Sequence, residues 1–136
     1  MTVVIDCNVI VMCLSTRSPY HFIFKSLIKG SFNLAVTVDI VLEYEEVVQQ
    51  KFSPTTAHAF SSLLKELQNV QHISPYYKWQ LIDVDPDDNK YCDCALAGSA
   101  SYIVTEDNHF GVLKNIPFPS ITIISIDTFL AMLLAL

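Results

Sequence analysis

The feature that most constrains the fold is the apolar run Val3-Val4-Ile5 near the start of the chain, which stops at Asp6. Three β-branched residues in succession are typical of a strand buried on both faces of a sheet. In open α/β sheets, ligands bind in the crevice beyond the carboxyl ends of the strands. The sequence therefore places a carboxylate where chemistry is usually carried out, although an aspartate that only caps the next turn would give the same pattern.

Segments typical of strands and helices alternate along the rest of the chain. Hydroxyl residues that can cap a helix occur at Thr37, and at Ser18 and Ser53, where proline follows. The predicted strands span residues 2–5, 32–36, 102–105 and 121–124, and the predicted helices span 19–29, 54–69, 88–97 and 126–135, with one more after Thr37. Residues 72–82 have no regular pattern. The alternation predicts a single α/β domain over residues 1–136, with a central parallel sheet of four to five strands flanked by helices.

Composition limits the functional classes. Of the 136 residues, 51% are hydrophobic, but no apolar run approaches the roughly 20 residues that a membrane helix needs. An acid at position 6 interrupts the pattern of a signal peptide, so we expect a cytoplasmic protein without membrane contact. The net charge of −6 argues against a broad nucleic-acid-binding surface, but not against a nuclease whose acids surround metal ions. The four cysteines lack zinc-site spacing, which indicates reduced thiols.

Acidic residues recur where the predicted strands end. Asp107 follows the third predicted strand, Glu43 lies in the helix after the second, and Asp88 begins the helix before the third. Carboxylates that gather with Asp6 in one crevice repel one another, by up to about a few kcal/mol per close pair near the surface. A hard divalent cation relieves this repulsion, and ligands that are all oxygen favour Mg²⁺ or Mn²⁺. Such a cation activates water and clamps phosphate oxygens.

Several acids also have a simpler interpretation. The helix pattern cannot choose between Glu43 and Glu45 as the residue that faces the crevice. Asp88 could act only as a helix cap, and the preceding Asp85 and Asp87 are more typical of turns and caps. Asp93 lies about 140° around the helix from Asp88, so the two cannot share a face. Asp93 is either a further ligand or an exposed residue.

Four short motifs, in this order, resemble those of the PIN-domain family of metal-dependent ribonucleases. They are Val4-Ile5-Asp6-Cys7-Asn8, Val36-Thr37 through Leu42-Glu43, Asp85-Pro86-Asp87-Asp88-Asn89-Lys90 with Ala95-Leu96-Ala97, and Ile103-Val104-Thr105-Glu106-Asp107. The Asp-rich third motif is similar to that of a narrower subgroup, the toxin components of toxin–antitoxin pairs. The resemblance extends over nearly the whole chain.

The resemblance implies a Rossmann-like sheet and endonucleolytic cleavage of RNA. The metal ligands that it implies are Asp6, Glu43, Asp88 and Asp107. In this assignment Glu43 is chosen over Glu45, and Asn8 and Thr105 orient the ligands from behind through hydrogen bonds. The implied partners are the RNA substrate, a cognate antitoxin protein and a second copy of the chain in a homodimer.

Two residues depart from the family pattern. Cys7 replaces the usual hydroxyl residue, which predicts a weaker hydrogen bond near the site. His109 stands where many relatives carry another aspartate after Asp107. We therefore expect His109 either to remove a second metal position or to present an imidazole to phosphate.

Two other functions stay open from the sequence. A phosphohydrolase similar to haloacid dehalogenases would use Asp6 as its nucleophile, but such enzymes usually carry a second aspartate where this chain has Asn8. A PIN-like domain that has lost catalysis would keep the fold and serve as a binding module. Cleavage of RNA with and without added metal separates these functions from the ribonuclease.

Two hypotheses concern the surface. Arg17, Tyr20 and His21 follow the first strand, and we expect them on the crevice side, where they could hold a phosphate and a base of RNA, although a solvated loop would have the same sequence. The last helix is apolar nearly all round, so it either packs entirely in the core or contributes to a homodimer contact.

Overall fold

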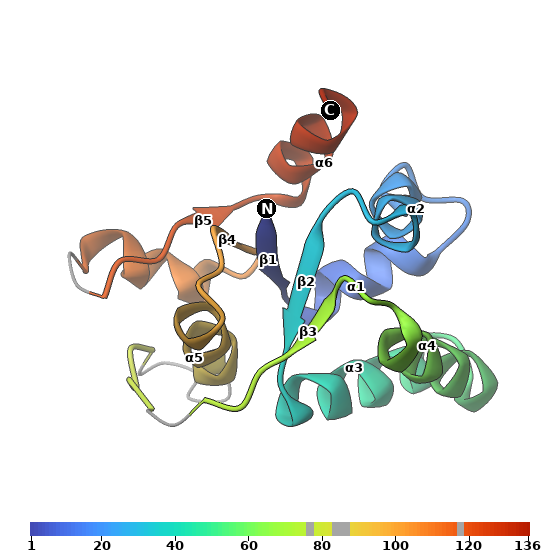
Figure 1. Ribbon diagram of the computed structural model, residues 1–136, viewed down its shortest axis with the longest axis horizontal. Coiled ribbons are helices and arrows are strands. Elements are labelled where there is room, and N and C mark those ends of the chain that lie inside the picture. The colour runs from blue at the N-terminus through green and yellow to red at the C-terminus, as the bar shows by residue number, and fades with distance from the viewer. Residues whose placement is uncertain (76–77, 83–87, 117–118) are drawn as a thin grey trace.

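Five parallel strands form the centre of the protein (Figure 1). The structure is a computed structural model, and it describes residues 1–75, 78–82, 88–116 and 119–136. The strands are β1 (Thr2–Ile5), β2 (Asn33–Val36), β3 (Val70–His72), β4 (Tyr102–Val104) and β5 (Ile123–Ile124). They pair in the order β3-β2-β1-β4-β5, and every pair is parallel. The predicted parallel sheet of four to five strands is confirmed.

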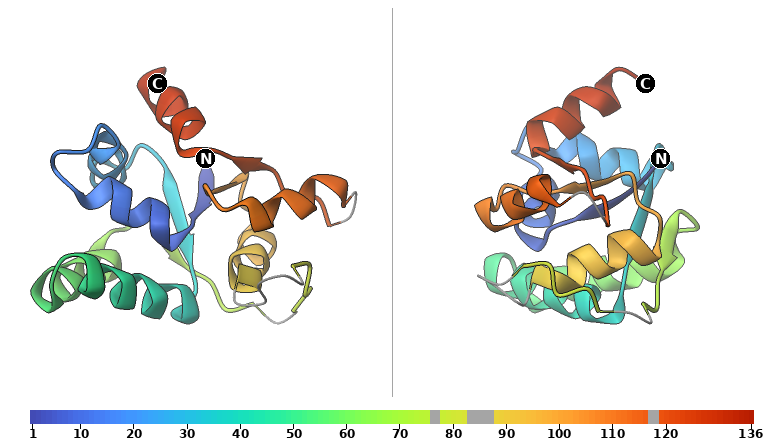
Figure 2. Two further views of the ribbon diagram at one scale, coloured as in Figure 1. Left: turned by 180° about the vertical axis from the view of Figure 1, so that it is seen from behind. Right: turned by 90° about the vertical axis from the view of Figure 1, so that its left-hand side faces the viewer.

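The helices divide between the two faces of this sheet. α1 (Cys7–Leu14) and α2 (His21–Lys29) connect β1 to β2, while α3 (Val38–Lys51) and α4 (Pro54–Glu66) connect β2 to β3. The chain then passes through α5 (Asn89–Ala97) to β4, on the other side of β1. Because parallel crossovers are right-handed, this reversal puts α5 on the opposite face from α1 to α4. Figure 1 shows α1 to α4 to the right of and below β1 and β2, and α5 to the left of these two strands, below β4. Figure 2 shows the same arrangement from behind.

The reversal creates a switch point between the carboxyl ends of β1 and β4. The register pairs Ile5, the last residue of β1, with Val104, the last residue of β4. Asp6 and Thr105 follow these two residues directly. Open α/β sheets bind ligands at such a switch point, so the topology places both side chains where a ligand is expected.

The core forms around the first two strands. Val3 and Val4 are fully buried and Ile5 is 1% exposed, which confirms that the first strand is buried on both faces. Phe32 packs edge-on against Phe129 of α6 (Ile126–Leu134), with the ring centroids 5.0 Å apart, so the last helix shares this core. Within the ranges that the structure describes, no helix combines the length and the apolar character needed to cross a membrane.

Two of the three predicted helix caps form as expected. Thr37 and Ser53 each accept a hydrogen bond from the backbone N–H three residues later, at 3.2 and 3.0 Å. α2 instead begins at His21, two residues later than predicted, because the Ser18 hydroxyl accepts a hydrogen bond from the Tyr20 N–H in a preceding turn. A sequence with the residues of a helix cap can therefore form a turn, and the helix then starts later in the chain.

Two segments differ from the sequence-based expectation. β3 lies where the end of a helix and an irregular stretch are predicted, since α4 ends at Glu66 and the chain turns to pair with β2. The sequence of β3, Val-Gln-His, has no strand pattern of its own, so pairing with the sheet decides its conformation. η2 (Asn108–Asn115), a 3-10 helix, replaces a predicted loop and begins where the Asp107 carboxylate accepts a hydrogen bond from the His109 N–H at 2.9 Å.

Candidate functional site

Thr105 connects the ends of β1 and β4. Its Oγ1 donates a hydrogen bond to Oδ2 of Asp6 at 2.9 Å and accepts one from the Asp107 N–H at 3.0 Å. Thr105 and Asp6 are both buried. A single hydroxyl thus fixes the Asp6 carboxylate and the start of the loop that carries Asp107.

α3 brings Glu43 to the same crevice. The buried hydroxyl of Tyr44 donates a hydrogen bond to the Ile5 carbonyl, which fixes α3 against the end of β1. The Glu43 side chain accepts a hydrogen bond on Oε1 from the Tyr91 hydroxyl and one on Oε2 from Nζ of Lys90, the latter at 2.9 Å. Both donors belong to α5, so Glu43 links the helices on the two faces of the sheet.

The other two glutamates of α3 face different surroundings. Glu45 accepts a hydrogen bond from the Ser61 hydroxyl on α4, and Glu46 is exposed. Of the three glutamates on this helix, Glu43 is the one that reaches the crevice. Packing against α4 and α5 therefore separates residues that helical periodicity alone could not.

We call Asp6, Cys7 and Glu43 the inner group. One ligand atom from each lies within 4.8 Å of the other two. Burial raises the pKa of the Cys7 thiol, and the charge of Asp6 adds to the rise, so the thiol stays protonated at neutral pH. A protonated thiol does not bind a hard cation, which leaves the two carboxylates as the metal-binding part of the inner group.

The two carboxylates of the inner group have pKa values shifted in opposite directions. Burial raises the pKa of Asp6 above its ordinary value of 3.8, despite the hydrogen bond from Thr105, and the charge of Asp107 adds to the rise. Burial also acts to raise the pKa of Glu43, but the two hydrogen bonds from α5 help to outweigh it and the pKa is lowered. Donors within the protein therefore compensate Glu43, whereas a bound cation would favour ionised Asp6.

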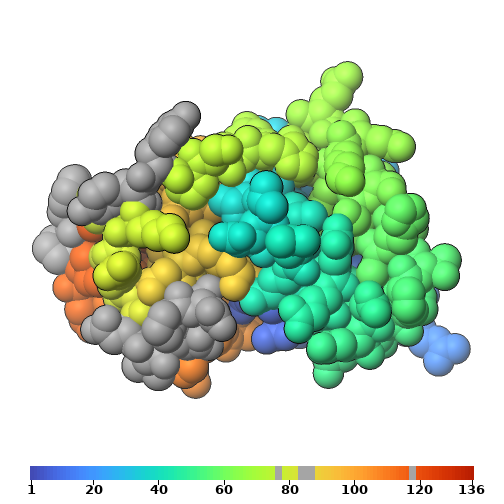
Figure 3. Space-filling view, turned by 90° about the horizontal axis from the view of Figure 1, so that it is seen from below, coloured from blue at the N-terminus to red at the C-terminus, as the bar shows by residue number. Residues whose placement is uncertain are grey.

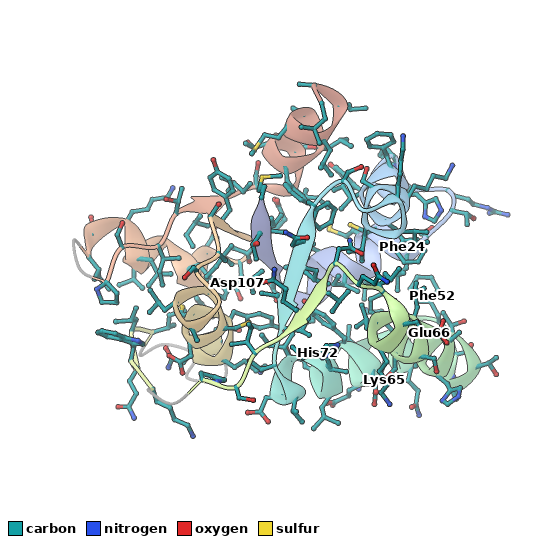
Figure 4. All side chains as sticks on the ribbon, viewed as in Figure 1. Phe24, Phe52, Lys65, Glu66, His72 and Asp107 are labelled. Atoms are coloured by element: carbon teal, nitrogen blue, oxygen red, sulfur yellow. The ribbon has the colours of Figure 1, made fainter. Side chains whose placement is uncertain are left out.

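We call Asp88, Asp107 and His109 the outer group. One ligand atom from each again lies within 4.8 Å of the other two. Nδ1 of His109 is 3.4 Å from Oδ1 of Asp107 and 3.7 Å from Oδ2 of Asp88. Asp88 precedes α5, but its side chain makes no capping hydrogen bond to the described residues of that helix. In Figure 4, Asp107 lies beside the ribbon of α5.

The four carboxylates implied by the family resemblance thus fall into two pairs, with Asp6 and Glu43 in the inner group and Asp88 and Asp107 in the outer group. Thr105 bonds to both sides, and the charge of Asp107 contributes to the raised pKa of Asp6. The two groups are therefore electrostatically coupled. Carboxylate oxygens in this arrangement fit a hard divalent cation such as Mg²⁺ or Mn²⁺.

The remaining acidic and amide candidates lie outside these two groups. Asn8 is exposed in the first turn of α1. Asp93 is buried on α5, where its carboxylate accepts a hydrogen bond from the Trp79 N–H at 3.0 Å and burial raises its pKa. Asp85 and Asp87 lie outside the described residues. A role for Asn8 or Asp93 in the site stays a prediction.

The residues predicted to contact RNA lie in and after the connection from α1 to α2. The Tyr20 hydroxyl donates a hydrogen bond to Asp127 at 2.7 Å, and Nδ1 of His21 lies 2.9 Å from the Cys13 carbonyl oxygen. Arg17 is exposed. This connection follows the end of α1 that is remote from Asp6, and its binding of RNA stays a prediction.

Sequence reasoning missed Lys90 and Tyr91, the two donors to Glu43. Both lie within one turn of Asp88 on α5. Asp88 and Tyr91 are three residues apart, and side chains at that spacing share a helix face. The spacing was the available signal, but it could not indicate that this face meets α3.

Comparisons with known proteins agree on the fold. A family model described as PIN domain matches residues 2–109, a range that contains both groups. Among curated proteins, no sequence gives a significant match. At 15% identity or less, the solved structures below show a common fold alone.

Three solved structures are similar to this chain over almost its full length. The structure of VapBC2 from Rickettsia felis, bound to a DNA fragment from their promoter, has a TM-score of 0.63 at 15% identity, over 92% of this chain and 98% of that chain. VapBC-1 from nontypeable Haemophilus influenzae has a TM-score of 0.60 at 15% identity, over 93% and 99%. FitAcB from Neisseria gonorrhoeae has a TM-score of 0.56 at 14% identity, over 91% and 97%.

Proposed function

Because the chain belongs to the PIN domain family, we propose that it is an endoribonuclease that hydrolyses RNA phosphodiester bonds with a carboxylate-bound Mg²⁺ or Mn²⁺. PIN domains are generally nucleases, and we propose RNA as the substrate and Mg²⁺ or Mn²⁺ as the cation. One observation carries the proposal: two pairs of carboxylates meet at the switch point of the sheet, linked by Thr105.

In this proposal Asp6 and Glu43 hold the cation from the inner side, and Asp88 and Asp107 hold it from the outer side. A divalent cation at this place supplies an activated water and clamps phosphate oxygens. Thr105 keeps the Asp6 carboxylate in position by its hydrogen bond of 2.9 Å. Asp6 and Glu43 come from elements that the sheet fixes in place, which supports a precisely positioned cation.

Tyr91 positions Glu43. The Cys7 N–H donates a hydrogen bond to the Tyr91 hydroxyl oxygen at 3.3 Å, and that hydroxyl donates to Glu43. Tyr91 is fully buried, so this chain of hydrogen bonds ties Glu43 to the start of α1. Lys90 holds the other Glu43 oxygen and is only partly buried.

His109 gives the outer group a role beyond metal binding. Its side chain is 41% exposed and stands beside two carboxylates. An imidazole in this position can contact a phosphate oxygen of the substrate while the carboxylates hold the cation. This assignment also explains how the chain can lack the aspartate that relatives carry there.

We further infer that a cognate antitoxin protein controls this activity. The support is the resemblance of the Asp-rich motif to the toxin subgroup, together with a fold shared with structures named VapBC and FitAcB. A homodimer is the other expected association. Light scattering at micromolar concentration tests the homodimer, and a monomer mass would contradict it.

The deciding experiment is cleavage of a single-stranded RNA by the wild type and by Asp6→Asn, in chelator, Mg²⁺ and Mn²⁺. We expect the wild type to cleave the RNA internally only when Mg²⁺ or Mn²⁺ is present. The Asp6→Asn variant should not cleave it under any of the three conditions. A wild type that gains thermal stability from Mn²⁺ but leaves the RNA intact would favour the inactive binding module. Release of phosphate from a monoester without cleavage of RNA would favour the aspartate-nucleophile phosphohydrolase.

A further inference from the structure

A cavity of about 530 Å³ opens between α3 and α5, and one of its lining residues, Lys90, contacts Glu43 of the inner group. Its walls are the start of α3, the segment that follows β3 and the first turns of α5. Figure 3 shows this face, where the cyan, yellow-green and gold surfaces of these three segments surround a hollow. The volume falls in the range of about 300–1,000 Å³ that is typical of small-molecule sites.

Hydrogen bonds fix two of these walls to each other. The Asn89 side chain accepts a hydrogen bond from the Ile82 N–H at 2.8 Å and donates one to the Ile82 carbonyl at 3.0 Å. The Asp93 carboxylate, which is 7% exposed, accepts the Trp79 N–H at 3.0 Å. Residues 78–82, which include the lining residue Lys78, are therefore attached to α5 at two places.

The lining of the cavity combines three kinds of chemistry. Lys78 and Lys90 contribute two positive charges, and Asp39 and Asp93 contribute two negative charges. Val38, which also lines the cavity, is 74% exposed and offers an apolar surface. A phosphate ion without a base would be attracted by the two lysines and repelled by the two carboxylates. A nucleotide uses all three kinds, with its phosphate toward lysines, its hydroxyl and amino groups toward carboxylates, and its base against the valine.

Lys90 connects the cavity to the candidate site. It lines the cavity, and its Nζ also donates the hydrogen bond of 2.9 Å to Glu43. The same Nζ lies 5.4 Å from the centre of the Tyr91 ring. A phosphate that is bound near Lys90 is thus one side chain away from the inner group.

We propose that this cavity binds one nucleotide of the RNA strand, next to the phosphodiester that is cut. The proposal rests on the proposed ribonuclease function and adds a place for the substrate. Lys78 and Lys90 contact the phosphate, and the base packs against Val38. A free nucleoside monophosphate has the same chemistry, so the experiment includes both forms.

The test compares Lys78→Ala and Val38→Asp with the matched control Lys65→Ala, on α4. Lys78, Val38 and Lys65 are all exposed, so none of these variants should change the melting temperature. Figure 4 shows Lys65 on α4, apart from Asp107. Affinity for a short fluorescein-labelled single-stranded RNA is measured by anisotropy over a salt series, in chelator to prevent cleavage. Lys78→Ala should weaken binding roughly threefold to tenfold and lower the salt slope by about one.

Val38→Asp should weaken binding of this RNA at least as much, and Lys65→Ala should leave it unchanged. Competition by AMP would show that free nucleotides enter as well, whereas weakened variants without AMP competition would restrict the cavity to nucleotides within a chain. Equal affinity of the wild type, Lys78→Ala and Val38→Asp would overturn the proposal. RNA binding that depends on these residues, with no cleavage in Mn²⁺, would keep the cavity and overturn the ribonuclease function.

Discussion

The inner and outer groups lie on either side of Thr105, yet their side chains are held in different ways. In the inner group, Asp6 accepts a hydrogen bond from Thr105, directly after β4, and Glu43 accepts one from Lys90 on α5. Asp6 is 4% exposed. In the outer group, the His109 side chain is 41% exposed and the Asp107 side chain 29%. Rigid elements thus build the inner group, whereas a loop and a short 3-10 helix carry most of the outer group. We expect the inner group to decide whether a cation binds, and the outer group to adjust how tightly.

The largest effect is expected from Asp6→Asn, which removes a buried charge at nearly constant volume. Because burial raises the pKa of Asp6, the ionised side chain lowers the stability of the metal-free protein at neutral pH. The variant should melt a few degrees above the wild type in chelator and gain less from Mn²⁺. Its cleavage rate should fall by more than the roughly 10–100-fold that loss of a partner behind a metal ligand costs.

Thr105→Val is the matched control for this variant. It keeps the charge of Asp6 but removes the hydrogen bond that Oδ2 accepts at 2.9 Å, together with the one from the Asp107 N–H at 3.0 Å. Valine leaves a buried carboxylate without this donor, so the protein should melt lower in chelator, by about 1–3 kcal/mol of unfolding free energy. The two substitutions should therefore shift the metal-free melting temperature in opposite directions, and shifts of the same sign would contradict this account of Asp6.

Lys90→Met tests whether Lys90 acts as the internal counter-ion of the inner group. Methionine keeps much of the apolar stem and removes the charge that bonds to Glu43 at 2.9 Å. The metal-free protein should lose about 1–2 kcal/mol of stability. The shift in melting temperature caused by Mn²⁺ should grow, because Mn²⁺ no longer competes with the Lys90 ammonium for the Glu43 carboxylate. Lys65→Met is the control, and a smaller Mn²⁺ shift in Lys90→Met would show that Lys90 assists the cation instead.

The pH dependence of stability should separate the two inner carboxylates. The pKa of Glu43 is lowered on folding, so its contribution is present above its ordinary value of 4.5 and is lost as the pH falls through the lowered value. The pKa of Asp6 is raised, so protonation of Asp6 stabilises the fold as the pH falls through that raised value.

Melting of metal-free Asp6→Asn and Glu43→Gln over an acid pH series checks these signs. The stability advantage of Asp6→Asn should shrink as the pH is lowered, starting above 3.8. The deficit of Glu43→Gln should shrink only below about 4.5, where the unfolded carboxyl takes up a proton while the folded one, with its lowered pKa, stays ionised. If the difference in melting temperature between each variant and the wild type stays constant with pH, ionisation of these two carboxyls does not contribute to stability.

The contrast between the groups also explains what could be predicted from the sequence. Asp6 and Asp107 each follow a predicted apolar strand, so the rule for carboxyl ends of parallel strands places both without any packing information, whereas the role of Thr105 was implied only by the family resemblance. The bond between Lys90 and Glu43 joins residues 47 positions apart. It depends on how α5 meets α3 after the sheet reverses, and local patterns carry no signal for that. The 3-10 helix after Asp107 was likewise hidden, because its start depends on a side-chain hydrogen bond to the backbone.

Asp107→Asn probes the outer group with a smaller expected effect on stability. The Asp107 carboxylate accepts the His109 N–H at 2.9 Å, and asparagine can accept the same hydrogen bond. Loss of the Asp107 charge also removes its repulsion of the Asp6 carboxylate. The metal-free melting temperature should therefore stay equal or rise slightly, within about 0.5 kcal/mol. The Mn²⁺ shift should shrink without vanishing, and an unchanged shift would exclude Asp107 from the cation site.

A comparably small change in stability is expected from His109→Asp, which introduces the acid that many relatives carry. Nδ1 of His109 stands 3.4 and 3.7 Å from the carboxylates of Asp107 and Asp88, so a third carboxylate adds repulsion. Because the side chain is 41% exposed, water screens this repulsion, and the metal-free protein should lose less than about 1 kcal/mol. Cation affinity should rise severalfold by calorimetry, while His109→Asn, which adds no charge, should leave it near the wild-type value.

If the imidazole contacts the RNA phosphate, both variants should also raise the KM for RNA. An unchanged KM in both, with tighter Mn²⁺ binding in His109→Asp, would show that position 109 acts on the cation and not on the substrate.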